Sequence, residues 1–191
     1  MILYLSIILI CMAIIATFNI IFNLDAFGGN VWYVILVVVC AVIIEIIIDL
    51  ISAGIIHSIK DKHFKETNRL FVVSKSKRKF LEKLGIKHWK DKVVELGALG
   101  GFSKSKLEDG SNIEYIDKFL MESYKGIVVH IFNIIFGFAL MAIPPYSYSL
   151  CVSLPVAIVN MFLSILPIMV LQYNIPKLQV VRARLQRQNN K

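Results

Sequence analysis

The sequence has little that would support a metal centre or a familiar hydrolase site. It contains three cysteines, none in a CxxC motif or in a Cys/His cluster with zinc spacing, so we predict no metal site and no cofactor. It also lacks the GxSxG motif of a serine nucleophile and the HExxH motif of a zinc protease. An intramembrane hydrolase remains an alternative function, which a bound divalent metal would favour.

Charged residues are also scarce, at 18% of the chain, whereas 57% of the residues are hydrophobic and the mean hydropathy is +0.70. This composition is too apolar for an ordinary soluble domain. Four apolar runs, residues 2–22, 31–56, 126–143 and 149–171, are near the length of about 20 residues that a membrane-crossing helix needs. The first run lacks the basic start of a signal peptide. We predict an all-α polytopic membrane protein with four transmembrane helices in two hairpins.

Positive charge predicts the orientation of these helices. Of the 21 lysine and arginine residues, 16 fall between Lys60 and Lys125 and 5 between Lys177 and Lys191, while the two short loops have none. Because lysine and arginine stay on the cytoplasmic side, we predict a multi-pass protein of the cell membrane with both termini in the cytoplasm. Contact with anionic headgroups of membrane lipids also fits the net charge of +8. Nucleic acid is not an expected partner, because the basic segments show no binding motif.

The charge pattern divides the chain into four predicted segments. They are an N-terminal transmembrane hairpin at 1–56, a basic cytoplasmic or membrane-surface segment at 57–125, a C-terminal transmembrane hairpin at 126–173 and a basic cytoplasmic tail at 174–191. Residues 74–85 predict a basic amphipathic surface helix that has Phe80, Leu81 and Leu84 on its apolar face and stops at Gly85. Ser111 and Glu114 predict the capping box of a second helix. The glycines of residues 97–101 predict a loop between the two.

Two acidic residues interrupt the second apolar run. Glu45 and Asp49 are four residues apart, so they share one helix face within roughly 6 Å of each other. One interpretation is structural: Asp49 lies near the cytoplasmic boundary, and Glu45 pairs with a lysine or histidine of the central segment. The other is that the pair binds a cation or orients a catalytic group. A glycosidase site is disfavoured, because a buried helical pair is poorly placed to flank a sugar ring.

Three further ionisable residues lie where the polar segment enters the third apolar run. Glu122, Lys125 and His130 fall within an arc of about 140° on a helix. His130 lies inside the apolar run, where a neutral imidazole is suited to act as a general base. The alternative is that Lys125 extends its charge to the membrane surface and His130 only bonds a neighbouring helix.

Four short motifs occur in a fixed order over residues 60–178. They are DKHF (Asp61, Lys62, His63, Phe64), HWKDKV (Trp89, Lys90, Lys92), ESYKGIVVH (Glu122, Lys125, His130) and PIMVLQYNIPKL (Pro167, Gln172, Tyr173, Asn174, Pro176, Leu178). Together they resemble the glycosyl-4,4'-diaponeurosporenoate acyltransferase family, which acylates a glycosylated carotenoid. The pattern departs from that of the family at Ile131 and Ile165 and lacks an arginine between Gln172 and Tyr173.

The resemblance implies a membrane-bound acyltransferase in lipid metabolism and carotenoid biosynthesis. The fatty acyl group would pass from a thioester donor, acyl-CoA as co-substrate, to a hydroxyl of a lipid or glycolipid acceptor. His130 would be the base and Glu122 its orienting carboxylate, with Asp61 or Asp49 as the alternatives to Glu122. The group that stabilises the oxyanion or holds the donor phosphates would be Lys90, Lys92, Lys125 or Asn174. The implied substrate-binding residues are Asp61, Trp89, Lys90, Lys92, Tyr173 and Asn174. The competing interpretation is a non-enzymatic membrane scaffold or accessory subunit, and no oligomeric state is predicted.

Overall fold

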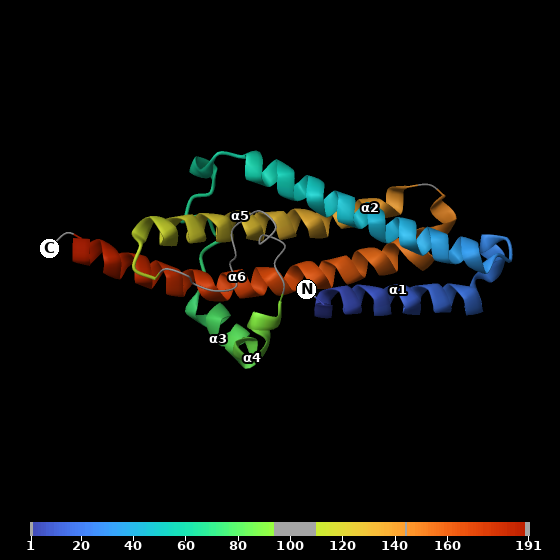
Figure 1. The fold of residues 1–191 in the computed structure, drawn as a ribbon, viewed down its shortest axis with the longest axis horizontal. Coiled ribbons are helices and arrows are strands. Elements are labelled where there is room, and N and C mark those ends of the chain that lie inside the picture. Colours follow the sequence, from blue (N-terminus) through green and yellow to red (C-terminus); the bar gives the residue numbers. More distant parts are fainter. Residues whose placement is uncertain (1, 94–109, 144, 190–191) are drawn as a thin grey trace. The chain divides into compact units, whose positions relative to one another are not determined.

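The computed structural model describes residues 2–93, 110–143 and 145–189, and all the regular secondary structure in these ranges is helical (Figure 1). Four helices in these ranges are long and apolar enough to cross a membrane. The predicted all-α class and the four candidate crossings are therefore confirmed, and they indicate a multi-pass membrane protein. The glycine-rich loop predicted at 97–101 lies outside the described residues.

The four long helices are α1 (Ile2–Phe22), α2 (Val31–Ser58), α5 (Ile113–Gly137) and α6 (Leu154–Asn189). α1 and α2 match the first two apolar runs closely. α5 is longer than the third run, because the amphipathic stretch before residue 126 continues into it without a break. α6 contains Pro167 and Pro176 and spans 36 residues, roughly 54 Å at 1.5 Å per residue. Its basic end therefore extends past a hydrocarbon core about 30 Å thick.

Short elements connect the long helices. They are η1 (Leu24–Phe27), η2 (Asp61–His63), α3 (Lys75–Lys83), α4 (Ile86–Trp89), η3 (Lys90–Lys92), η5 (Phe138–Ala142), η6 (Tyr146–Tyr148) and η7 (Ser149–Ser153). The predicted stop of α3 is confirmed, because Gly85 follows it in the left-handed region with φ 68°. The predicted cap of α5 is one residue early. Asn112, not Ser111, precedes the helix, and its Oδ1 accepts the amide of Glu114 at 2.9 Å.

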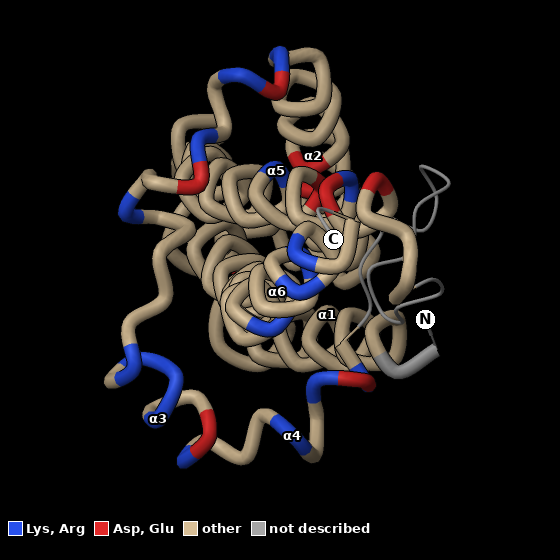
Figure 2. The backbone as a smooth tube through the Cα atoms, turned by 90° about the vertical axis from the view of Figure 1, so that its left-hand side faces the viewer, with Lys and Arg blue, Asp and Glu red and all other residues tan. Residues whose placement is uncertain are grey.

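Backbone contacts divide the chain into two units. Unit 1 comprises Met1–Gly54 and Ile131–Ser164, and unit 2 comprises Ile55–His130 and Ile165–Lys191. All 21 lysine and arginine residues belong to unit 2. Figure 2 marks those among the described residues in blue, for example on α3 and α4. The fold thus separates a unit without basic side chains from one that holds all of them.

Unit 1 has an apolar core between its helices and its two short loops. Val34 and Val38 of α2 are buried with Val152 of η7. Phe27 of η1 stacks on Tyr148 of η6 with ring centroids 4.4 Å apart. An aromatic stack of this kind contributes about 0.5–1.5 kcal/mol beyond its buried area. The two short loops therefore lie at the same end of unit 1.

Unit 2 has a smaller apolar cluster where α3 and α4 meet α6. Leu81 of α3, Ile86 of α4 and Tyr173 of α6 are each at most 2% exposed. Phe80 and Leu84, in contrast, are 58% and 46% exposed. Only Leu81 of the predicted apolar face thus packs inward, and the placement of α3 on a membrane surface stays a prediction.

Candidate active site

Within unit 2, an ion pair joins the first and third sequence motifs. Lys125 on α5 has its Nζ 2.6 Å from Oδ1 of Asp61 in η2, and Lys125 is only 8% exposed. The same Nζ lies 5.8 Å from the ring centroid of Phe64, within cation–π range. A short charge-assisted bond and an aromatic face together hold one ammonium group in a fixed place. The structure therefore brings together motif residues that are some sixty positions apart in the sequence.

A carboxylate–imidazole pair lies in the same unit. Glu122 Oε2 is 3.3 Å from Nε2 of His57, near the end of α2. The sequence predicts that Glu122 orients His130 instead. On one helix these two residues are eight positions apart, about 12 Å along the axis. The Glu122–His130 pairing stays a prediction, and His57 becomes a second imidazole to consider as a base.

The second and fourth motifs meet in the apolar cluster of unit 2. Trp89 packs against this cluster, and its indole Nε1 donates to the Leu84 carbonyl at 3.0 Å. Tyr173 is 1% exposed, and Nζ of Lys177 lies 4.0 Å from its ring centroid. The rings of Trp89 and Tyr173, both predicted to bind substrate, therefore pack within the protein at the apolar cluster of unit 2.

The remaining predicted substrate-binding residues lie apart from the Lys125–Asp61 pair. Lys90 pairs with the neighbouring Asp91, Lys92 is exposed, and Asn174 is partly buried on α6. In the described part of the chain, no hydrogen bond or ion pair joins these three side chains to Lys125. Their role in substrate binding stays a prediction.

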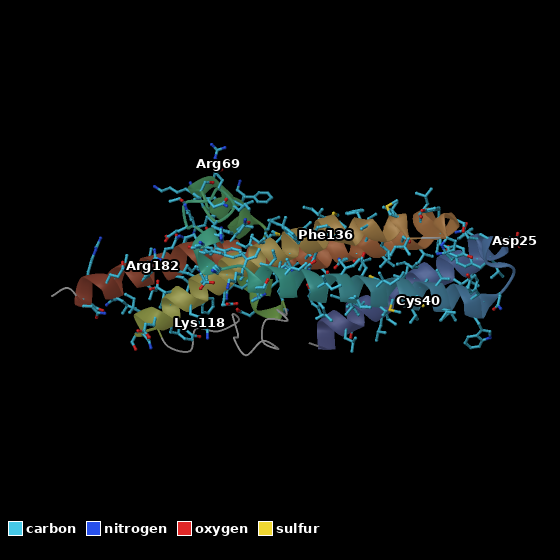
Figure 3. All side chains as sticks on the ribbon, turned by 90° about the horizontal axis from the view of Figure 1, so that it is seen from above. Asp25, Cys40, Arg69, Lys118, Phe136 and Arg182 are labelled. Atoms are coloured by element: carbon cyan, nitrogen blue, oxygen red, sulfur yellow. The ribbon has the colours of Figure 1, made fainter. Side chains whose placement is uncertain are left out.

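A polar network that was not predicted from the sequence joins α6, α5 and the segment after η2. Arg182, labelled in Figure 3, pairs with Glu66 and lies 3.5 Å from Asp117. Gln179 donates to Glu66 at 2.8 Å and to the Tyr124 hydroxyl at 3.4 Å. No single spacing in the sequence signals this network. It forms because Gln179 and Arg182, three residues apart, share one face of α6.

The network predicts a stability difference between two arginines of α6. Arg182→Ala should lower the free energy of unfolding by about 1 kcal/mol, because it removes partly exposed ion pairs. Arg184→Ala is the matched control: Arg184 is exposed on the same helix, and we expect a change within about 0.5 kcal/mol. Thermal unfolding of the detergent-solubilised protein measures both. Equal shifts would contradict a stabilising network.

Unit 1 holds the acidic pair of α2 in a polar cluster. Nδ2 of Asn160 on α6 lies 3.1 Å from Glu45 Oε2 and 3.4 Å from Asp49 Oδ1, and 3.5 Å from the backbone oxygen of Asn133 on α5. In the described ranges, the donor to Glu45 is therefore an amide and not the lysine or histidine of the structural interpretation. Asn160 could have been predicted from the sequence. Like Glu45, it is a polar residue inside an apolar run.

Gly137 makes the close approach at this cluster possible. A Cβ at this position would lie 2.9 Å from Asn160 Nδ2 and 3.1 Å from Glu45 Oε2. Gly137→Ala should therefore displace Asn160 and lower the free energy of unfolding by roughly 1–3 kcal/mol. Gly54→Ala in α2 meets nothing within 4 Å and should raise stability by up to about 1 kcal/mol through helix propensity. Melting temperatures that shift in the same direction would contradict this packing.

Comparison with known proteins identifies the family to which the chain belongs. The model of the family described as glycosyl-4,4'-diaponeurosporenoate acyltransferase matches residues 60–184, well over half of the chain. No curated protein and no solved structure matches. The matched region contains all four motifs and the Lys125–Asp61 pair, in agreement with the resemblance found in the sequence. The chain therefore belongs to the glycosyl-4,4'-diaponeurosporenoate acyltransferase family and is an acyltransferase.

Proposed function

We propose that the protein transfers a fatty acyl group from a thioester donor, acyl-CoA, to a hydroxyl of a lipid or glycolipid acceptor at the cell membrane. The observation that carries this proposal is the ion pair between Lys125 and Asp61. It joins residues of two motifs of an acyltransferase family, and a carboxylate–imidazole pair lies in the same unit. The four apolar helices supply the setting that a lipid acceptor requires.

The chemistry needs a base, a carboxylate and a cation. His130 takes the proton of the acceptor hydroxyl, and the oxygen attacks the thioester carbonyl. The charge that develops on the carbonyl oxygen is stabilised by Lys125. Collapse of the tetrahedral intermediate breaks the carbon–sulfur bond, and the proton held by the imidazole returns to the thiolate as CoA leaves. In this proposal Glu122 is the carboxylate that favours the protonated form of the imidazole base.

Charge distribution supports a polyanionic donor. All lysine and arginine residues belong to unit 2, so the phosphates of CoA would meet positive charge there. Lys90, Lys92, Trp89 and Asn174 remain candidates for binding the donor. In this proposal unit 2 faces the cytoplasm, with both termini on the same side.

The donor and the reaction type are tested together with purified protein in lipid nanodiscs. Isotope-labelled acyl-CoA is supplied with and without a hydroxylated glycolipid, and free thiol and acylated lipid are both measured. We expect thiol release that depends on the acceptor and equals the acylated lipid formed. Thiol release without acylated lipid would instead indicate a hydrolase. Acylation from an acylated carrier protein but not from acyl-CoA would overturn the donor assignment.

A further inference from the structure

The acidic cluster of unit 1 contains hydrogen-bond acceptors that lack donors. Glu45 and Asn133 are each 4% exposed. Glu45 Oε1 and Asn133 Oδ1 are buried without a hydrogen-bond partner among the described residues. Leaving a buried polar group without a hydrogen-bond partner destabilises a protein, and a buried charged group does so more strongly. Both residues belong to one cluster, because Asn160 Nδ2 lies 3.1 Å from Glu45 Oε2 and 3.5 Å from the backbone oxygen of Asn133. Two such acceptors in one cluster call for a donor or a cation.

The carboxyl group of Glu45 is directed into the cluster. Both of its oxygens lie close to Gly137 of α5, at 3.1 Å and 3.3 Å from the place of a Cβ. Oε2 accepts from Asn160, which also approaches Asp49 and the Asn133 backbone. The single amide of Asn160 is thus shared among three acceptors. It cannot neutralise two carboxylates.

Unit 1 has no positive charge of its own. Its sequence, Met1–Gly54 and Ile131–Ser164, contains no lysine, arginine or histidine, and its acidic residues are Asp25, Glu45 and Asp49. No element of unit 1 therefore brings a cation to the cluster. Along α2 the next ionisable residue is His57, about 12 Å beyond Asp49 at 1.5 Å per residue, and it contacts Glu122. Along α5 it is His130, about 10 Å before Gly137.

The net charge of the cluster determines whether Glu45 and Asp49 can both be ionised. Glu45 and Asp49, if both were ionised, would repel each other within about one helical turn. Removing each charge from water into a protein interior is also unfavourable. Such a pair persists in an apolar segment when a positive charge reduces its net charge. Carboxylate and amide oxygens are hard ligands that suit a proton or a small hard cation.

We propose that Glu45 and Asp49, with Asn133 and Asn160, form a site that holds one exchangeable positive charge, a proton or a sodium ion, inside unit 1. Both ions have the chemistry that the site requires, because each is small, carries a single positive charge and binds to oxygen atoms. The site stands independently of the proposed acyl donor and acceptor.

The test uses dicyclohexylcarbodiimide, an apolar reagent that modifies protonated carboxyl groups in membrane surroundings. Wild-type protein in nanodiscs is treated over a range of pH in sodium-free buffer and in buffer with sodium, and the adducts are located by peptide mass spectrometry. We expect modification at Glu45 or Asp49, falling about tenfold for each pH unit on the alkaline side. Asp25, exposed in η1, is the internal control and should stay unmodified.

Each outcome has a defined meaning. Suppression of the adduct by sodium identifies a sodium site, and an adduct that sodium leaves unchanged identifies a proton site. Loss of the adduct in Glu45→Gln, an isosteric change made on protein with the wild-type melting profile, assigns it to Glu45. Absence of any adduct at Glu45 and Asp49 across the pH range would overturn the proposal, because both carboxylates would then stay ionised beside a positive charge from elsewhere.

Discussion

Replacing His130 with alanine should lower acyl transfer by roughly 10²–10⁴-fold, the range in which a general base contributes. The acceptor hydroxyl would then lose its proton to water alone. Partial burial of His130 on α5 makes a folding check necessary. The rate of acylated-lipid formation is therefore normalised to folded protein, measured by size-exclusion chromatography and thermal unfolding.

His57→Ala is the informative comparison, because His57 is the imidazole that contacts Glu122. If His130 is the base, the His57 variant should keep most of its activity, and the Glu122–His57 pair has a supporting role. A large loss in His57→Ala together with an active His130→Ala would move the base to His57. Full activity in both variants would contradict any imidazole base.

Lys125→Ala should also lower acyl transfer strongly, by about 10²-fold, which is the usual cost of removing one donor to an oxyanion. The ammonium of Lys125 is fixed by Asp61 at 2.6 Å and is hardly exposed, so it is held in place before substrate arrives. Lys125→Arg should restore only part of the rate, because a guanidinium has a different shape and reach. Initial rates over a range of acyl-CoA concentrations measure kcat and KM separately.

Lys118→Ala serves as the matched control for Lys125. Lys118 lies on the same helix and is exposed (Figure 3). Removing it takes away the same charge from unit 2, so a long-range effect on donor binding would appear in both variants. A fall in kcat confined to Lys125→Ala supports a role at the reacting carbonyl. Equal losses of kcat in both variants would mean that Lys125 contributes only to the overall positive charge of unit 2.

Long apolar runs made the helices predictable. The bounds of α1 and α2 follow the sequence closely because almost every residue in them is apolar and a turn-forming stretch separates them. The start of α5 was harder to place, since its amphipathic first half and its apolar second half carry different patterns along one helix. The continuation of α6 into the predicted basic tail was not foreseen, because the apolar run ends at residue 171 while the helix runs on through Pro176.

The candidate site was predictable as a set of residues but not as a set of contacts. Asp61 and Lys125 were selected from separate motifs, and only the fold shows that they pair. The contact between Glu122 and His57 could not be predicted by the helical-wheel argument, which considers one helix and cannot see His57 on another. The pairing of Glu122 with His130 stays a prediction. Likewise, Glu66 and Arg182 are ordinary surface charges in the sequence. Their pairing depends on how the segment after η2 returns to α6.

Mass spectrometry of lipids tests the central claim most directly. Cells that make glycolipids and carotenoid glycosides are compared when they express the wild type, His130→Ala or neither, with membrane levels of both proteins quantified. The account predicts a lipid species heavier by one fatty acyl group that is present only with the wild type, and its mass identifies the acceptor. Identical lipid profiles in all three, with the protein present in the membrane, would contradict the proposed acyl transfer to a membrane lipid.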